Sequence, residues 1–273
     1  MKYDNIKILS ADIDGTLSRS DYTVSQKTLD TITKCREKGY LFGLASGRPL
    51  EDVLGKYKEW KLEKQFDFII GWNGCELYDD ATKKSYQYNY LSKQDLKEIV
   101  TFMSQFDCSI NMYDPGCYLS SRKTDRAWYS AFKNKRTFVK VDSLDAFYQH
   151  DNGGIMFRLK LEDVPMIEEK VNEFIKGKDF VGFKTQADLY EFSHKNCNKG
   201  YALKKYSELK NIPLDDCMAF GDTTNDNKML ECCHGVCLLN GSDDTKACAE
   251  VITDIVCDDD GWADFIDKNL FID

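Results

Sequence analysis

The sequence contains no long apolar run, and this absence limits where the protein can act. Apolar residues make up 42% of its 273 residues, enough for a buried core. They never accumulate into a stretch that could span a bilayer. The N-terminal segment also lacks the extended apolar region of a secretory signal peptide, because its first apolar stretch covers only Ile6 to Ala11. We therefore expect a soluble protein that stays in the cytoplasm.

Positive charge is also scarce relative to negative charge. The chain has 37 lysine and arginine residues against 46 aspartate and glutamate residues, which gives a formal net charge of -9. A surface of this sign repels polyanions at long range, so we expect neither nucleic acid nor an anionic membrane as a partner. Any phosphate group that binds would need a local cation or a group of backbone amides.

A complete set of zinc ligands is missing from the cysteine-rich segment at 232–237. A structural zinc site needs four ligands at suitable spacing, and Cys248 and Cys257 do not supply a familiar second pair. We interpret the segment as a helix end followed by a buried strand, and we expect no zinc.

Two regions of the chain alternate short apolar runs with amphipathic segments. The first region predicts strands at 6–11, 40–45 and 68–71, a helix from Ser25 to Lys38, and a second helix opened by residues 46–49. The second region predicts helices from Lys199 and over 225–232, with strands at 217–220, 235–239 and 251–255. Strands that alternate with helices predict a parallel sheet covered by helices on both faces.

In the middle of the chain, strands and helices are predicted in a different order. It predicts a helix at 92–105, a hairpin at 108–121, a strand at 154–161, a helix at 164–176 and two strands within 180–192. This order is typical of an α+β module with an antiparallel sheet. We therefore predict an α/β fold with a Rossmann-like parallel sheet core, formed by residues 1–80 and 191–273. The α+β domain at 81–190 is inserted into it.

Acidic residues follow two of the predicted core strands. Asp12 and Asp14 close the first strand, and Asp222 and Asp226 follow the strand at 217–220. Ligands bind at the carboxyl edge of open parallel sheets, so we expect these four carboxylates to converge there. Each pair alone would also suit a solvated turn or a helix cap. Four mutually repelling carboxylates, however, need a cation among them, and oxygen ligands favour magnesium over zinc.

Two further segments offer phosphate-binding groups. Ser46 and Gly47 supply a hydroxyl and a backbone amide at the start of a helix. Lys199 supplies a point charge at the start of another helix, and Lys195 is a rival for that role. An ordinary helix cap and an ordinary solvated lysine would explain these residues equally well when each is considered alone.

Four motifs in this order resemble the haloacid dehalogenase superfamily, and more narrowly its Cof-like hydrolases. They are Asp-x-Asp-Gly-Thr-Leu at 12–17, Ala-Ser-Gly-Arg at 45–48, Lys-Gly-x-Ala-Leu at 199–203 and Gly-Asp-x-x-Asn-Asp at 221–226. The resemblance covers essentially the whole chain, and the inserted domain takes the place of the cap of that branch. Trp72 and Cys75 depart from the usual pattern beside the insertion. The resemblance implies a phosphatase that uses Mg²⁺.

The resemblance also implies roles for individual residues. Asp12 would be the nucleophile that forms an aspartyl phosphate, and Asp14 would be the general acid and base. The metal ligands would be the Asp12 carboxylate, the Asp14 main-chain carbonyl and the Asp222 carboxylate. The phosphate-binding residues would be Ser46, Gly47, Lys199 and Asn225, while Asp226 would position the others.

The substrate is expected to be a small phosphate ester, and we hypothesise a sugar phosphate. Candidate contacts in the cap are Tyr113, Arg122, Arg126, Trp128 and Tyr190. A phosphomutase or phosphotransferase would use the same aspartyl phosphate, and the motifs do not exclude it. A receiver-type signalling domain would leave Asp14 without a use, and a non-catalytic scaffold would not need the complete motifs. The oligomeric state does not follow from the sequence.

Overall fold

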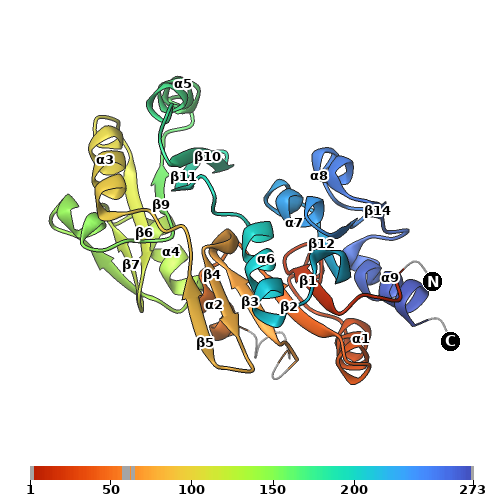
Figure 1. Ribbon diagram of the computed structural model, residues 1–273. Coiled ribbons are helices and arrows are strands. Elements are labelled where there is room, and N and C mark those ends of the chain that lie inside the picture. The colour runs from red at the N-terminus through yellow and green to blue at the C-terminus, as the bar shows by residue number, and fades with distance from the viewer. Residues whose placement is uncertain (1–2, 57–61, 63–64, 272–273) are drawn as a thin grey trace. The chain divides into compact units, whose positions relative to one another are not determined.

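The computed structural model describes residues 3–56, 62 and 65–271 (Figure 1). It divides into two compact units: Met1–Tyr88 with Asn198–Asp273, and Asn89–Cys197. We call them the core unit and the inserted unit. These boundaries fall later in the chain than the predicted ones, because β5 (Lys84–Gln87) belongs to the core sheet and β11 (Leu189–His194) belongs to the sheet of the inserted unit.

The sheet of the core unit has the strand order β14-β13-β12-β1-β2-β3-β4-β5. Its strands are β1 (Ile8–Asp12), β2 (Leu41–Ala45), β3 (Phe68–Gly71), β4 (Glu76–Asp79), β5 (Lys84–Gln87), β12 (Cys217–Gly221), β13 (His234–Cys237) and β14 (Val251–Ile252). The run from β14 to β3 is parallel, as the sequence predicts. The sequence did not predict the antiparallel hairpin of β4 and β5 at one edge.

Helices cover both faces of this sheet (Figure 1). The helices are α1 (Gln26–Glu37), α2 (Leu50–Lys56), α6 (Lys199–Lys210), α7 (Asn227–Glu231), α8 (Asp243–Cys248) and α9 (Gly261–Leu270). Leu9 of β1 belongs to an apolar cluster with residues of α1, α2 and α9, whereas Ile8 belongs to a cluster with residues of α6 and α7. Successive residues of a strand point to opposite faces, so β1 is buried on both sides, as a central parallel strand should be.

The helix ends show why these segments fold locally as predicted. The Ser25 hydroxyl accepts a hydrogen bond from the Thr28 amide and caps α1. Gly39, with a φ of 90°, supplies the left-handed residue that commonly follows a helix. The Asn198 side chain accepts from the Tyr201 amide at 2.8 Å and caps α6, which makes Lys199 the first helical residue.

The inserted unit contains a second sheet, in the order β10-β11-β9-β6-β7-β8. Its strands are β6 (Ser109–Asp114), β7 (Cys117–Ser120), β8 (Thr137–Lys140), β9 (Ile155–Arg158), β10 (Phe180–Gln186) and β11 (Leu189–His194). Its helices are α3 (Lys93–Met103), α4 (Asp125–Lys133) and α5 (Val164–Phe174). The antiparallel sheet was predicted, but β8 pairs in parallel with β7, and neither β8 nor α4 was predicted.

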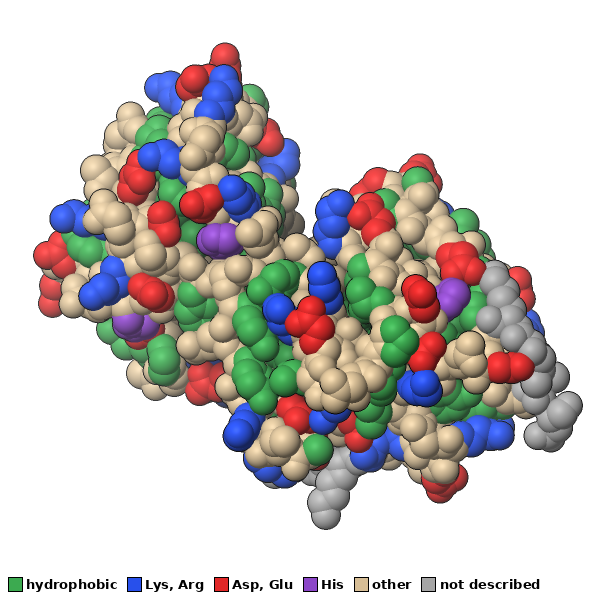
Figure 2. All heavy atoms as spheres, in the orientation of Figure 1, with side chains coloured by type: hydrophobic (Ala, Val, Ile, Leu, Met, Phe, Trp, Pro, Cys, Tyr) green, Lys and Arg blue, Asp and Glu red, His purple; other side chains and the backbone are tan. Residues whose placement is uncertain are grey.

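The surface carries charges of both signs. Figure 2 shows acidic and basic side chains interspersed over the face that it displays. Within the described residues, no helix is both long enough and apolar enough to cross a membrane.

Candidate active site

Two neighbouring strands of the core sheet end at the site. β1 ends at Asp12, and Asp222 directly follows β12. The two strands pair in parallel, with Ala11 opposite Phe220. Their carboxyl ends therefore meet at one edge of the sheet, where ligands bind in open parallel sheets. Asp12 and Asp222 lie on the same edge, as the sequence interpretation requires.

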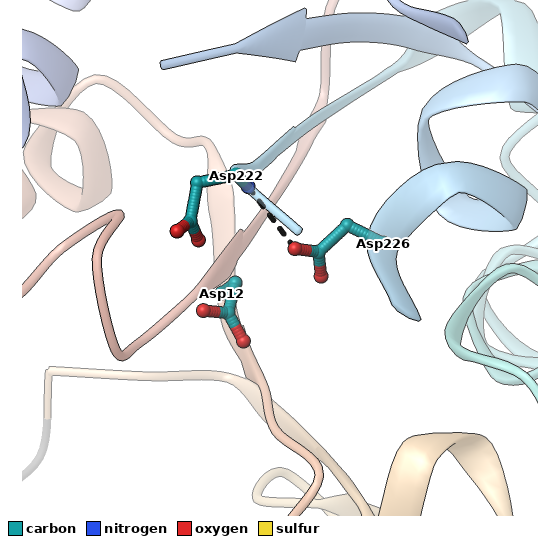
Figure 3. A group of neighbouring side chains, drawn as sticks. All are labelled: Asp12, Asp222 and Asp226. Atoms are coloured by element: carbon teal, nitrogen blue, oxygen red, sulfur yellow. Dashed lines mark hydrogen bonds between the residues drawn. The ribbon is translucent and has the colours of Figure 1, made fainter. Parts of the chain in front are cut away.

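Three carboxylates meet at this edge. One oxygen from each of Asp12, Asp222 and Asp226 lies within 4.8 Å of the other two, and the three side chains point toward a common space (Figure 3). Their exposed fractions are only 7%, 8% and 0%. Burial, followed by the charge of Asp226, raises the pKa of Asp222 to about 6. Burial also raises the pKa of Asp12 well above its usual range, although Lys199 opposes this shift. Three carboxylates so close together are electrostatically costly unless positive charge lies among them.

Lys199 lies inside this group. Its side chain is fully buried, and its Nζ donates to Asp12 Oδ1 at 2.5 Å and to Asp226 Oδ1 at 2.6 Å. Burial opposes the charge on Lys199, but Asp12 and Asp226 outweigh burial and raise the pKa of the ammonium group. The rival Lys195 forms an ion pair with Asp179 at 2.7 Å in the inserted unit. Lys199 is therefore the lysine that contacts the carboxylates.

Asp226 holds the other members of the group in place. Its Oδ2 accepts hydrogen bonds from the backbone amides of Asp222 and Thr223, each at 3.1 Å, while its Oδ1 accepts from Lys199. A side chain at Gly221 would come within 2.4 Å of the Asp226 Cβ, so this close approach requires glycine. Because both Asp226 oxygens already accept hydrogen bonds, the arrangement favours a positioning role for this residue.

The turn after β1 is fitted closely to Asp222. The Thr16 hydroxyl donates to Asp222 Oδ1 at 3.0 Å. Gly15 has a φ of 88°, and a Cβ there would lie 2.4 Å from Asp222 Oδ2. Glycine is therefore required both for its backbone conformation and for the space it leaves. Thr16 lies in the first motif, but no contact was predicted for it from the sequence.

The Asp14 side chain does not join the three carboxylates, so the expectation that all four would converge was wrong for this one. Asp14 Oδ2 accepts hydrogen bonds from Arg48 Nη2 at 2.8 Å and from Arg48 Nε at 3.2 Å. Arg48 thus balances the charge of this carboxylate through an ion pair at 2.8 Å. Arg48 lies in the second motif, but the sequence analysis gave it no role.

Asn73 joins the loops after β2, β3 and β12, since its backbone amide donates to the Ser46 carbonyl at 3.0 Å and its side chain accepts from Asn225. The buried Ser46 hydroxyl accepts from the Arg48 amide at 3.1 Å and thereby stabilises the turn before α2. Asn225 Nδ2 donates to Asn73 Oδ1 at 3.1 Å, and a Cβ at Gly47 would lie 3.1 Å from the same oxygen. Asn73 has a left-handed φ of 52°, which asparagine tolerates better than most residues. It links two predicted phosphate-binding segments and was not assigned a role from sequence.

Comparison with known proteins agrees with this geometry. The sequence model of the haloacid dehalogenase-like hydrolases matches residues 9–266. The chain is 26% identical to 5-amino-6-(5-phospho-D-ribitylamino)uracil phosphatase YitU of Bacillus subtilis, over 95% of this chain and 96% of that protein. It is also 26% identical to an HMP-PP phosphatase of Yersinia enterocolitica, over 82% of this chain and 80% of that protein.

The fold is similar to solved structures as well. A haloacid dehalogenase-like hydrolase from Bacteroides thetaiotaomicron superposes with a TM-score of 0.85 at 23% identity, over 96% of this chain and 99% of the other. The predicted fold class is thereby confirmed. The phosphatase class expected from the four motifs is also confirmed. Because the family model covers nearly the whole chain, the protein belongs to the haloacid dehalogenase-like hydrolases.

Proposed function

We propose that the protein is a magnesium-dependent phosphatase that hydrolyses a small phosphorylated metabolite through an aspartyl phosphate on Asp12. The observation that carries this proposal is the buried group of Asp12, Asp222 and Asp226 with Lys199 inside it. This group provides a nucleophile, a set of oxygen ligands and a fixed positive charge at the carboxyl edge of a parallel sheet.

The residues of the group fit a magnesium ion. All the available donors are oxygen atoms, which suit a hard cation. Three carboxylates and one ammonium group leave two negative charges in excess, and a divalent cation would balance them. The Asp12 and Asp222 carboxylates would hold the metal together with the main-chain carbonyl of Asp14. When bound, the ion would neutralise charge on the phosphoryl group and keep the two carboxylates ionised.

Asp12 would attack the phosphorus atom directly. Lys199 donates to Asp12 Oδ1, the oxygen that would also face the metal, which leaves Oδ2 as the attacking atom. The Oδ2–P bond forms while the bond from phosphorus to the ester oxygen breaks. Lys199, the Ser46 hydroxyl and the Gly47 amide would stabilise the charge on the phosphoryl oxygens, and Asn225 would complete their set. Asp226 would keep Lys199 in place throughout.

Asp14 would carry the proton in both steps. Because Arg48 holds Oδ2 of Asp14, Oδ1 is left to deliver a proton to the departing ester oxygen. The same oxygen would then accept a proton from the water that attacks the aspartyl phosphate, which releases inorganic phosphate and regenerates Asp12. Arg48 is thus the residue that orients the acid and base.

The substrate we propose is a sugar phosphate or a metabolite with a similar phosphorylated chain, handled in the cytoplasm. The printed name of the Bacillus subtilis relative includes a phosphorylated ribityl chain. The inserted unit has an open surface cavity of about 470 Å³ lined by Asp125, Arg126, Tyr129, Arg158 and Gln186, side chains that suit a polar ligand.

Two of the residues predicted to contact substrate differ in burial. Tyr190 is only 2% exposed, packs in the apolar core of the inserted unit and donates its hydroxyl to the Gly182 carbonyl. Its candidacy for substrate contact was therefore wrong. Trp128, by contrast, is 50% exposed on α4, and like Arg126 it stays a candidate for substrate contact.

Phosphate release tests the proposal directly. Inorganic phosphate would be measured with p-nitrophenyl phosphate and with a panel of phosphorylated sugars and related metabolites, with Mg²⁺ and with a chelator present. We expect metal-dependent release without any added acceptor. Release that required a second sugar would identify a phosphotransferase instead. Undiminished hydrolysis in the chelator would contradict the magnesium role, and phosphorylation of a residue other than Asp12 would contradict the intermediate.

A further inference from the structure

A third loop lies at the same edge of the core sheet and contacts the loops that follow β1 and β12. It follows β13, the neighbour of β12. The Leu238 amide donates to the Gly221 carbonyl at 3.0 Å, and the Ser242 amide donates to the Asp222 carbonyl at 2.9 Å. Residues 238–242 therefore support the backbone that carries Asp222.

The same loop reaches the turn after β1 through one side chain. Asn240 Nδ2 donates to the Gly15 carbonyl at 2.8 Å, while Asn240 Oδ1 accepts from the Cys257 amide at 2.8 Å. Both ends of the side-chain amide are thus used, one as donor and one as acceptor. Asn240 is exposed, so packing in the core does not explain this residue.

The position of Gly15 controls the spacing of the metal site. A Cβ on Gly15 would lie 2.4 Å from Asp222 Oδ2, and the next residue, Thr16, donates to Asp222 Oδ1. The preceding residue, Asp14, provides the main-chain carbonyl of the proposed metal site. A displacement of Gly15 would therefore move a proposed ligand and a hydrogen-bond donor away from Asp222 together.

A second set of contacts holds the outer part of the same turn. Arg19 Nη2 donates to the two carboxylate oxygens of Asp260 at 3.1 and 3.2 Å. The Ser20 amide and hydroxyl donate to Asp258 at 2.7 and 3.0 Å. Residues 257–260 thus anchor the turn at its outer end, and Asn240 connects that anchor to Gly15 at its inner end.

We infer that Asn240 is a positioning residue for the metal centre. By holding the Gly15 carbonyl, it keeps the Asp14 carbonyl and the Thr16 hydroxyl in register with Asp222. This inference rests on the proposed function, because it assigns Asn240 to the magnesium site of that function. Partners that orient metal ligands from outside the coordination shell commonly change metal affinity by 10-fold or more.

Direct titration with Mg²⁺ tests this role. Isothermal titration would give the Kd for the wild type, for Asn240→Ala and for Asn269→Ala. Asn269 is a matched control, since its Nδ2 also donates to a backbone carbonyl at 2.8 Å, that of Phe265 within α9. We expect about a tenfold weaker Kd for Asn240→Ala and an unchanged Kd for Asn269→Ala. Hydrolysis by Asn240→Ala should recover as the Mg²⁺ concentration is raised.

The possible outcomes separate this inference from the function on which it rests. An unchanged Mg²⁺ affinity in Asn240→Ala would overturn the positioning role while leaving the phosphatase intact. A wild-type protein that binds no Mg²⁺ would overturn the proposed function itself. If the alanine variant does not fold, Asn240→Ser removes the same donor with a smaller change in polarity, and the same loss of affinity is expected of it.

Discussion

The charged group at the candidate site of the core unit and two ion pairs of the inserted unit hold their charges in opposite ways. In the core unit, Lys199 is fully buried between Asp12 and Asp226. In the inserted unit, Lys195 and Arg126 pair with carboxylates while their own side chains are 48% and 65% exposed. Exposed pairs contribute little to stability, whereas breaking a buried pair leaves an uncompensated charge. The buried arrangement therefore marks the part of the molecule in which we propose that charge takes part in the reaction.

The largest expected effect follows from replacing the proposed nucleophile. Asp12→Asn should lower the turnover number by at least about 10⁴-fold, as loss of a nucleophile does in other covalent enzymes. The fold should persist, because the amide fills nearly the same volume and relieves repulsion within the carboxylate group. Turnover would be measured with p-nitrophenyl phosphate, and folding by circular dichroism. A matched change in the inserted unit, Asp188→Asn, should leave turnover of this small substrate unchanged.

The second effect sharpens the contrast between buried and exposed lysines. Lys199→Ala should abolish turnover and lower the free energy of unfolding by about 3–5 kcal/mol, because it leaves Asp12 and Asp226 buried without their partner. Lys195→Ala should change neither quantity measurably, since its pair with Asp179 is open to solvent. Urea unfolding of both variants gives the comparison. Equal destabilisation by the two substitutions would remove the distinction between the units.

The third effect is a dependence of stability on pH. Burial raises the pKa of Asp222 from 3.8 to about 6, so the folded, metal-free protein binds a proton more readily than the unfolded chain. This contribution to stability is fully present below pH 3.8 and is lost as pH rises through about 6. Asp107 in the inserted unit works in the opposite direction, because its hydrogen bond with Lys160 lowers its pKa.

Thermal unfolding from pH 4 to pH 8 would separate these contributions. The Mg²⁺-dependent rise in Tm should be large at pH 7.5 and should shrink as pH falls below about 6, where a proton competes with the metal for Asp222. Asp222→Asn should flatten the metal-free profile in this range. A rise in Tm with Mg²⁺ that is equally large at pH 5 would show that Asp222 is not a ligand.

The sequence predicted the core better than the insertion, and the reason is physical. Buried parallel strands such as β3 are continuous apolar runs between polar turns, so their limits can be read directly from the sequence. Helix α4 lacks the usual pattern in which the large apolar residues face the core. It buries the small residues Ala127 and Ala131, while Trp128, Tyr129 and Phe132 are at least half exposed. An apolar periodicity therefore does not indicate which face of α4 is buried.

The residues of the candidate site also differ in how well the sequence predicts them. Asp12 and Asp222 could be predicted because Asp12 ends one buried strand and Asp222 directly follows another, and parallel strands place such residues on one edge. Arg48, Asn73 and Asn240 could not, since their contacts join residues that are 34, 152 and 225 positions apart in the chain. Nothing in the local sequence determines which distant group a long polar side chain will reach.

The smallest expected effect concerns an exposed pair in the inserted unit. Arg126 pairs with Asp188, which is also held by Arg158 at 2.6 Å. Arg126→Ala should therefore lower the free energy of unfolding by less than about 1 kcal/mol, because Arg158 still compensates the Asp188 charge. Hydrolysis of p-nitrophenyl phosphate should be unchanged, whereas KM for the preferred metabolite should rise if the cavity beside Arg126 binds it. A loss of several kcal/mol in urea unfolding would mean that this exposed pair is as important to the fold as the buried one around Lys199. The contrast between the two units would then have to be abandoned.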